Sequence, residues 1–107
     1  MKKTFKMILL ALLLCSPAYA GQIYGSLKEG GRPLANVTFD VFCPQGSVRG
    51  TTDGYGAYSM NVGKGKCTFR VYYRDQQPSL DIFSSDSPLR YDFDVVNANG
   101  TLTLVRR

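Results

Sequence analysis

The alternation of apolar and polar side chains is the feature that most constrains what this chain can fold into. It begins near Gln22, recurs in nearly every apolar segment, and leaves no segment with helical spacing. Because successive side chains of a strand point to opposite faces, a period of two is typical of half-buried strands. The alternation therefore predicts an all-β domain. The inward phase contains Val37, Phe39, Val41, Cys43, Tyr58, Met60, Val62, Cys67, Phe69, Val71, Tyr73, Leu89, Tyr91, Phe93, Val95, Leu102 and Leu104.

Turn signals rich in Gly, Pro, Asn and Asp separate these apolar runs at short intervals. They lie at residues 29–33, 44–46, 53–56, 63–65 and 97–100. Short strands joined by such turns predict a Greek-key β-sandwich of about seven strands. The least regular segment, residues 74–88, is expected to form a long edge connection with one short strand around Leu80–Phe83.

The first twenty residues have the features of a secretory signal peptide. Three lysines precede a short apolar run at residues 7–14, and Ala18–Ala20 forms a small-residue cleavage motif. Cleavage before Gly21 would leave one domain, residues 21–107, in the periplasm or outside a bacterial cell. The apolar run is too short to span a membrane. A lipid anchor on Cys15 is the alternative, which the leucine preceding it disfavours.

Two cysteines remain after export, Cys43 and Cys67. In an oxidising compartment they have one pairing, so a Cys43–Cys67 disulfide is expected. Closing a loop of about 25 residues should stabilise the fold by roughly 3 to 4 kcal/mol. Both cysteines fall on the inward phase of their strands, which predicts that the bond lies in the core.

The charge of the whole chain overstates the charge of the exported domain. The formal net charge is +5, but the leader carries three of the thirteen basic residues, which leaves ten basic and eight acidic residues. A net charge of +2 gives little reason to expect nucleic-acid binding. We therefore predict no nucleic-acid partner.

The absence of histidine limits the chemistry of the chain. A serine or cysteine nucleophile would lack its usual base, and zinc would lack its usual ligands. Four aspartates crowd the second half, but they lack the spacing of a calcium loop. We expect no enzyme, metal or cofactor, and a small hydrolase using Asp92 and Asp94 is the weakest alternative. The four aspartates are Asp81, Asp86, Asp92 and Asp94.

A set of glycines, turn residues and strand residues recurs in a fixed order between Gly21 and Tyr73: Gly21, Ile23, Gly25, Gly31, Pro33, Leu34, Val37, Thr52, Asp53, Gly56, Tyr58 and Gly65. In this order and spacing the segment resembles the carboxypeptidase regulatory-like domain, a transthyretin-like, or prealbumin-like, β-sandwich. The resemblance implies a fold more than an activity, because such domains serve as accessory modules for folding, adhesion or carbohydrate contact. It also implies turn or structural roles for Gly31, Pro33, Thr52, Asp53, Gly56 and Tyr58.

The stretch TTDGYGAY, residues 51–58, predicts a tight turn between two strands. Asp53 can hydrogen-bond its own backbone at the start of the turn, and Gly54 and Gly56 can take positive φ. Tyr58 then points inward. Asp53 is therefore interpreted as a turn residue and not a catalytic acid, while Tyr55 at the tip is a candidate contact residue.

These observations predict a binding or accessory module for a protein or envelope partner, which acts through an edge strand or its hairpin tips. The alternative is a carbohydrate-binding module that uses the exposed aromatics Tyr55, Phe42 and Tyr72. Phe42 and Tyr72 lie on the outward phase of their strands. A competing expectation is that the 74–88 segment covers both rings.

Overall fold

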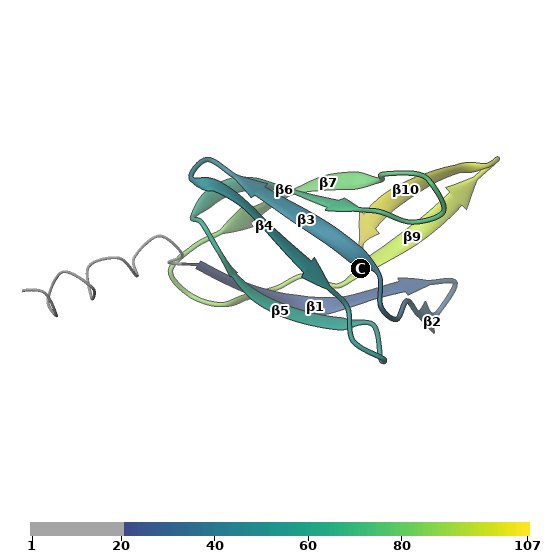
Figure 1. The fold of residues 1–107 in the computed structure, drawn as a ribbon, viewed down its shortest axis with the longest axis horizontal. Coiled ribbons are helices and arrows are strands. Elements are labelled where there is room, and N and C mark those ends of the chain that lie inside the picture. The colour runs from purple at the N-terminus through teal and green to yellow at the C-terminus, as the bar shows by residue number, and fades with distance from the viewer. Residues whose placement is uncertain (1–20) are drawn as a thin grey trace, which may run out of the picture.

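The structure, a computed structural model, describes residues 21–107 (Figure 1). The predicted signal peptide lies outside the described residues. The domain consists of ten strands in two sheets, so the prediction of an all-β sandwich is confirmed. Within residues 21–107 there is no helix long and apolar enough to cross a membrane.

The first sheet is built around its longest strand, β1. This strand pairs antiparallel with β5 on one side, and in parallel with β8 and then β9 on the other. β10 pairs antiparallel with β9 and ends the sheet. The strands are β1 (Gly21–Glu29), β2 (Arg32–Pro33), β5 (Ala57–Val62), β8 (Leu89–Arg90), β9 (Phe93–Ala98) and β10 (Thr101–Arg106).

The second sheet is antiparallel throughout and has the order β4-β3-β6-β7, so β4 and β7 are its edges. The strand expected within residues 74–88 is β7, which lies at an edge as predicted. The bounds are β3 (Thr38–Cys43), β4 (Gly46–Thr51), β6 (Gly65–Val71) and β7 (Ser79–Ser84).

The core lies between the two sheets and follows the predicted phase. Its centre is a run of aromatic rings. The ring centres of Phe39 and Phe69, which are stacked, lie 4.7 Å apart, and those of Phe69 and Phe93 lie 4.6 Å apart. Such aromatic pairs stabilise a core beyond their buried area. The disulfide between Cys43 and Cys67 is present and joins the neighbouring strands β3 and β6 of one sheet.

The expectation of about seven strands was too low. The short strand β2 pairs with the end of β1, and the run predicted as one strand over residues 89–95 is divided into β8 and β9. At the break, the Tyr58 hydroxyl donates to the Tyr91 carbonyl oxygen at 2.6 Å. A Cβ atom at Gly25 would overlap this carbonyl, so glycine permits the close approach of β1.

Candidate functional site

The turn between β4 and β5 is organised by Asp53. Its Oδ1 accepts hydrogen bonds from the N–H of Tyr55 at 2.8 Å and of Ala57 at 2.9 Å. These two bonds lower the pKa of Asp53, because they stabilise its charged form. Of the two glycines, Gly56 has positive φ, at 77°, and Gly54 does not. The carboxylate is thus engaged by its own backbone, and the Tyr55 side chain is left 83% exposed at the tip.

Thr52 holds the neighbouring loop against this turn. Its buried hydroxyl donates to the Leu34 carbonyl oxygen at 2.6 Å and accepts from the Val37 N–H at 2.9 Å. Gly31 has a φ of 83° in the turn before Pro33, which lies in the short strand β2. These residues shape the connections of the sandwich.

Phe42 and Tyr72 lie on the outer face of the second sheet, where they meet arginines. The Arg70 guanidinium lies 4.8 Å from the centre of the Phe42 ring, and that of Arg49 lies 5.5 Å from the Tyr72 ring. We call this surface the arginine–aromatic face, and its fifth member is Asp40. The strand of the 74–88 segment, β7, lies beside β6 in the same sheet, and arginines of β4 and β6 contact the two rings. Tyr72 also lines a recess with residues 73–77, so covering by the 74–88 segment stays a prediction.

Asp40 is the residue of this face that sequence reasoning missed. Its alternation phase predicted an exposed acid, yet it is only 8% exposed. Arg49 binds both of its oxygens, at 2.9 and 3.0 Å, and the Tyr72 hydroxyl donates to Oδ2 at 2.7 Å. The bond from Arg49 is the main reason that the pKa of Asp40 is lowered, and burial opposes it. Only the cross-strand register of β3 and β4, which the sequence does not display, pairs these two residues.

Each sheet has two edges, and the hydrogen bonds determine which backbone groups are free there. In an antiparallel edge strand, alternate residues turn their N–H and C=O away from the neighbour. On β7 the outward residues are Ser79, Asp81 and Phe83, and the hydroxyl of Tyr91 bonds both backbone groups of Phe83. One of the three outward positions of β7 is therefore capped by a side chain.

The two edge strands of the first sheet, β5 and β10, each have one outward residue whose backbone is bonded by a side chain. On β5, the Ala57 carbonyl oxygen accepts a hydrogen bond from the Asp53 N–H, and the Ala57 N–H donates to the Asp53 carboxylate. On β10, the Leu102 N–H donates to the side-chain oxygen of Gln76 at 2.9 Å. The same amide group of Gln76 donates to the Gly100 carbonyl oxygen. Such caps limit unwanted pairing at sheet edges.

The edge strand β4 differs from the other three. Its outward residues are Ser47, Arg49 and Thr51, because Thr52 bonds Val37 and fixes the alternation. Among the residues that the structure describes, no contact caps the backbone of any of these three. The Arg49 side chain folds over the sheet toward Asp40 and leaves the edge clear. This strand therefore offers an uninterrupted row of free backbone donors and acceptors.

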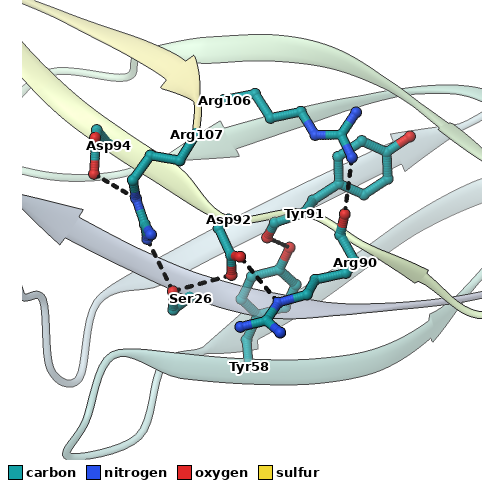
Figure 2. A network of polar contacts seen from close by, with 8 residues as sticks. All are labelled: Ser26, Tyr58, Arg90, Tyr91, Asp92, Asp94, Arg106 and Arg107. Carbon is teal, nitrogen blue, oxygen red and sulfur yellow. Dashed lines mark hydrogen bonds and ion pairs between the residues drawn. The ribbon is translucent and has the colours of Figure 1, made fainter.

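A second polar cluster lies on the outer face of the first sheet (Figure 2). Arg90 pairs with Asp92 at 2.9 Å, and Arg107 pairs with Asp94 at 2.7 Å. Ser26 joins the two pairs, since its hydroxyl donates to Asp92 and accepts from Arg107. Asp92 and Asp94, the candidate carboxylates for hydrolysis, are each paired with an arginine and belong to a network that connects β9 to β1.

Residues 21–107 contain no group of three His, Cys, Asp or Glu residues close enough to hold a metal ion. One recess of about 310 Å³ opens beside β7. It is lined by Lys66, Leu80, Asp81, Ile82, Phe83, Tyr91 and Arg106. The edge strand beside this recess, β7, is capped at Phe83, and the ion pair between Lys66 and Asp81 lies in the lining of the recess.

The fold and its surfaces define a β-sandwich domain with one disulfide. No protein-family model matches the chain, and no curated protein matches its sequence. Among solved structures it is similar to the Bacillus anthracis TIE protein, with a TM-score of 0.57 and 17% identity over 70% of this chain and 17% of that one. A DUF3823 family protein from Parabacteroides merdae is similar at a TM-score of 0.55 and 9% identity, covering 79% of this chain and 45% of that one.

These likenesses show the fold alone. The chain spans less than half the length of either solved structure. The resemblance to carboxypeptidase regulatory-like domains therefore remains a prediction from the motifs between Gly21 and Tyr73.

Proposed function

We propose that this domain is a non-catalytic module that binds a partner protein by holding an extended segment of it on the free edge of β4. The observation that carries the proposal is the row of three outward residues, Ser47, Arg49 and Thr51, whose backbone groups have no partner within the described domain. Strand addition satisfies such groups and gives affinity through main-chain hydrogen bonds.

The length and composition of β4 support this proposal. The strand has six residues, contains no proline, and carries a single charged side chain, Arg49. Sheet edges are usually protected by prolines, inward charges, bulges or covering side chains. Side chains cap at least one outward position on each of β5, β7 and β10, whereas none caps β4 in the described domain.

The setting of the domain is also a proposal. The disulfide fits an oxidising compartment. Together with the predicted leader, it supports a periplasmic or secreted module with an envelope or protein partner. Within that proposal, we assign residues 21–107 to one Greek-key, transthyretin-like domain of the carboxypeptidase regulatory-like type.

A phage-displayed library of linear peptides, selected on the immobilised domain, tests the function. Peptides that bind should shift and protect the amides of Ser47, Arg49 and Thr51 in NMR spectra. Ser47→Pro should abolish binding, because it removes an outward N–H and costs no internal hydrogen bond. The matched control is Ser79→Pro on the opposite edge of the same sheet, which should leave binding intact.

Recovery of no binding peptide would overturn the proposal, and so would equal binding to Ser47→Pro. If Ser47→Pro does not fold, Thr51→Pro removes the outward N–H at the other end of the same row. Loss of binding in that variant, with an unchanged unfolding midpoint, supports the same conclusion.

Carbohydrate binding is a second candidate, and Tyr55 favours it because its side chain is 83% exposed at a turn tip. Phe42 and Tyr72 favour it less, since a guanidinium already occupies one face of each ring. Titration with a panel of soluble polysaccharides, read by tyrosine fluorescence, tests it. A response that Tyr55→Ala abolishes would support a sugar site at the tip.

A further inference from the structure

The outer face of the second sheet carries a row of charges that ends at the open edge. Neighbouring positions on β6, β3 and β4 place Arg70, Asp40 and Arg49 side by side across the sheet. The signs alternate from positive to negative to positive. Asp40 is the single carboxylate of this row, so the row retains one net positive charge. Asp40 forms its ion pair with Arg49, while Arg70 lies opposite it on β6.

Arg49 keeps hydrogen-bonding capacity toward the open side. Asp40 accepts from its Nε and one of its Nη2 hydrogens, while the side chain remains 66% exposed. A guanidinium has five N–H donors, so further donors are free to meet a second carboxylate. A residue directly across from Arg49 on an added strand would lie within cross-strand reach.

The neighbour that β4 already has shows which residues suit it. Opposite Val48, Arg49 and Gly50 stand Val41, Asp40 and Phe39 of β3, an acidic residue between two apolar ones. A Cβ atom added at Gly50 would overlap the side chains of Phe39 and Met60, which fill the space beneath this residue. Val48 and Met60 are half-buried apolar side chains packed against the core, and Met60 reaches the inner side of β4 at Gly50.

We infer that the partner segment bound on β4 carries an acidic residue opposite Arg49, flanked on both sides by apolar residues. The acid continues the alternating charge row, and the apolar residues point inward to cover Val48 and Met60. This inference rests on the proposed strand addition and adds the chemistry of the partner.

A second copy of the chain fits this edge less well. The register in which two β4 strands pair all three outward residues places Arg49 opposite Arg49 of the copy. Like charges directly opposite destabilise a strand pair. Charge complementarity thus favours an acidic segment of another protein over self-association.

Three synthetic peptides test the inference by fluorescence anisotropy with the full domain. They contain Thr-Val-Asp-Phe-Thr, Thr-Val-Asn-Phe-Thr or Thr-Val-Lys-Phe-Thr within identical polar flanks. The aspartate peptide should bind the natural domain about two- to five-fold more tightly than the asparagine peptide. It should bind roughly tenfold or more tightly than the lysine peptide, where attraction becomes repulsion.

The variant Arg49→Gln should bring the three affinities together, because it removes the charge but keeps the strand. Arg107→Gln, on the other sheet, is the matched control and should preserve the ranking. Equal affinities for the aspartate and lysine peptides would overturn the inference, as would failure of all three to bind. If the peptides bind equally but Ser47→Pro still abolishes binding, strand addition stands without the acidic preference. If Ser47→Pro has no effect, the proposed function fails as well.

Discussion

The Tyr91 hydroxyl donates to the Phe83 carbonyl oxygen at 2.8 Å and accepts from the Phe83 N–H at 3.0 Å. A side chain of the first sheet thus occupies both backbone groups that a partner strand would use at this point of β7. The Tyr91 ring is buried beneath Arg106, whose guanidinium lies 4.4 Å from its centre. The cap is therefore held in place by packing, and β7 is a poorer docking edge than β4.

This cap predicts a local change in amide exchange. Tyr91→Phe keeps the ring beside Phe93 but removes the hydroxyl, so the Phe83 N–H loses its acceptor. Its exchange should accelerate about tenfold, the equivalent of one hydrogen bond. Hydrogen exchange by NMR measures this, with Asp81, also outward on β7, as the internal reference. An unchanged Phe83 amide would show that the cap does not persist in solution.

Replacing both Cys43 and Cys67 with serine should destabilise the domain by about 3 to 4 kcal/mol. The bond closes a segment with a sequence separation of 24 residues and so restricts the unfolded chain. Urea unfolding of the oxidised natural domain and the double variant measures the difference. The reduced natural domain should behave as the variant does. A loss below about 1 kcal/mol would contradict the entropic origin of the stabilisation.

Gly25→Ala should destabilise the domain by about 2 to 3 kcal/mol, because the added Cβ overlaps the Tyr91 carbonyl and forces β8 away from β1. Gly54→Ala is the matched control. It lies in the exposed turn, has no positive φ and meets nothing within 4 Å. It should change the free energy of unfolding by no more than about 0.5 kcal/mol. Similar losses in the two variants would contradict the proposed overlap.

Tyr58→Phe should cost about 1 to 2 kcal/mol at neutral pH, because it leaves the buried Tyr91 carbonyl oxygen without its donor. Burial raises the pKa of Tyr58 above its usual range. A raised pKa stabilises the fold below the unfolded value of about 10, and that stability is lost as pH rises above it. Unfolding free energies between pH 9 and 11 should therefore fall more steeply in the natural domain than in the variant, by up to about 1.4 kcal/mol per pH unit. Parallel pH profiles would contradict this.

Asp40→Asn should cost about 1 kcal/mol at pH 7, a modest loss because Arg49 is largely exposed. The pKa of Asp40 is lowered in the fold, mainly by Arg49. Its contribution is thus complete above the unfolded value of about 3.9 and is lost as pH falls below it. The natural domain should lose its advantage over the variant in acid unfolding measurements. An advantage that persists at pH 2 would show that Asp40 acts through packing and not through charge.

The periodicity of the sequence was enough to predict the all-β class and the inward residues, and the number of cysteines was enough to predict the disulfide. The periodicity did not predict the short strand β2 or the break between β8 and β9. The turn at Asp53 was also readable, since its hydrogen bonds close within five residues. The sequence carried no comparable signal for strand neighbours. The parallel pairing of β1 with β8 and β9 joins segments far apart in the chain.

The candidate site depended on tertiary structure for the same reason. Asp40, Arg49 and Tyr72 come from three different strands, and only the register of the sheet brings their polar atoms within hydrogen-bond distance. Likewise, β4 is an edge strand because no other strand of residues 21–107 pairs with its outer side. The sequence of residues 46–51 does not show this. By itself the sequence determined the alternation, the turns and the cysteine pair, which are local or countable. The tertiary structure decided which edge stays open and which charge lies on it, because both depend on contacts between distant segments.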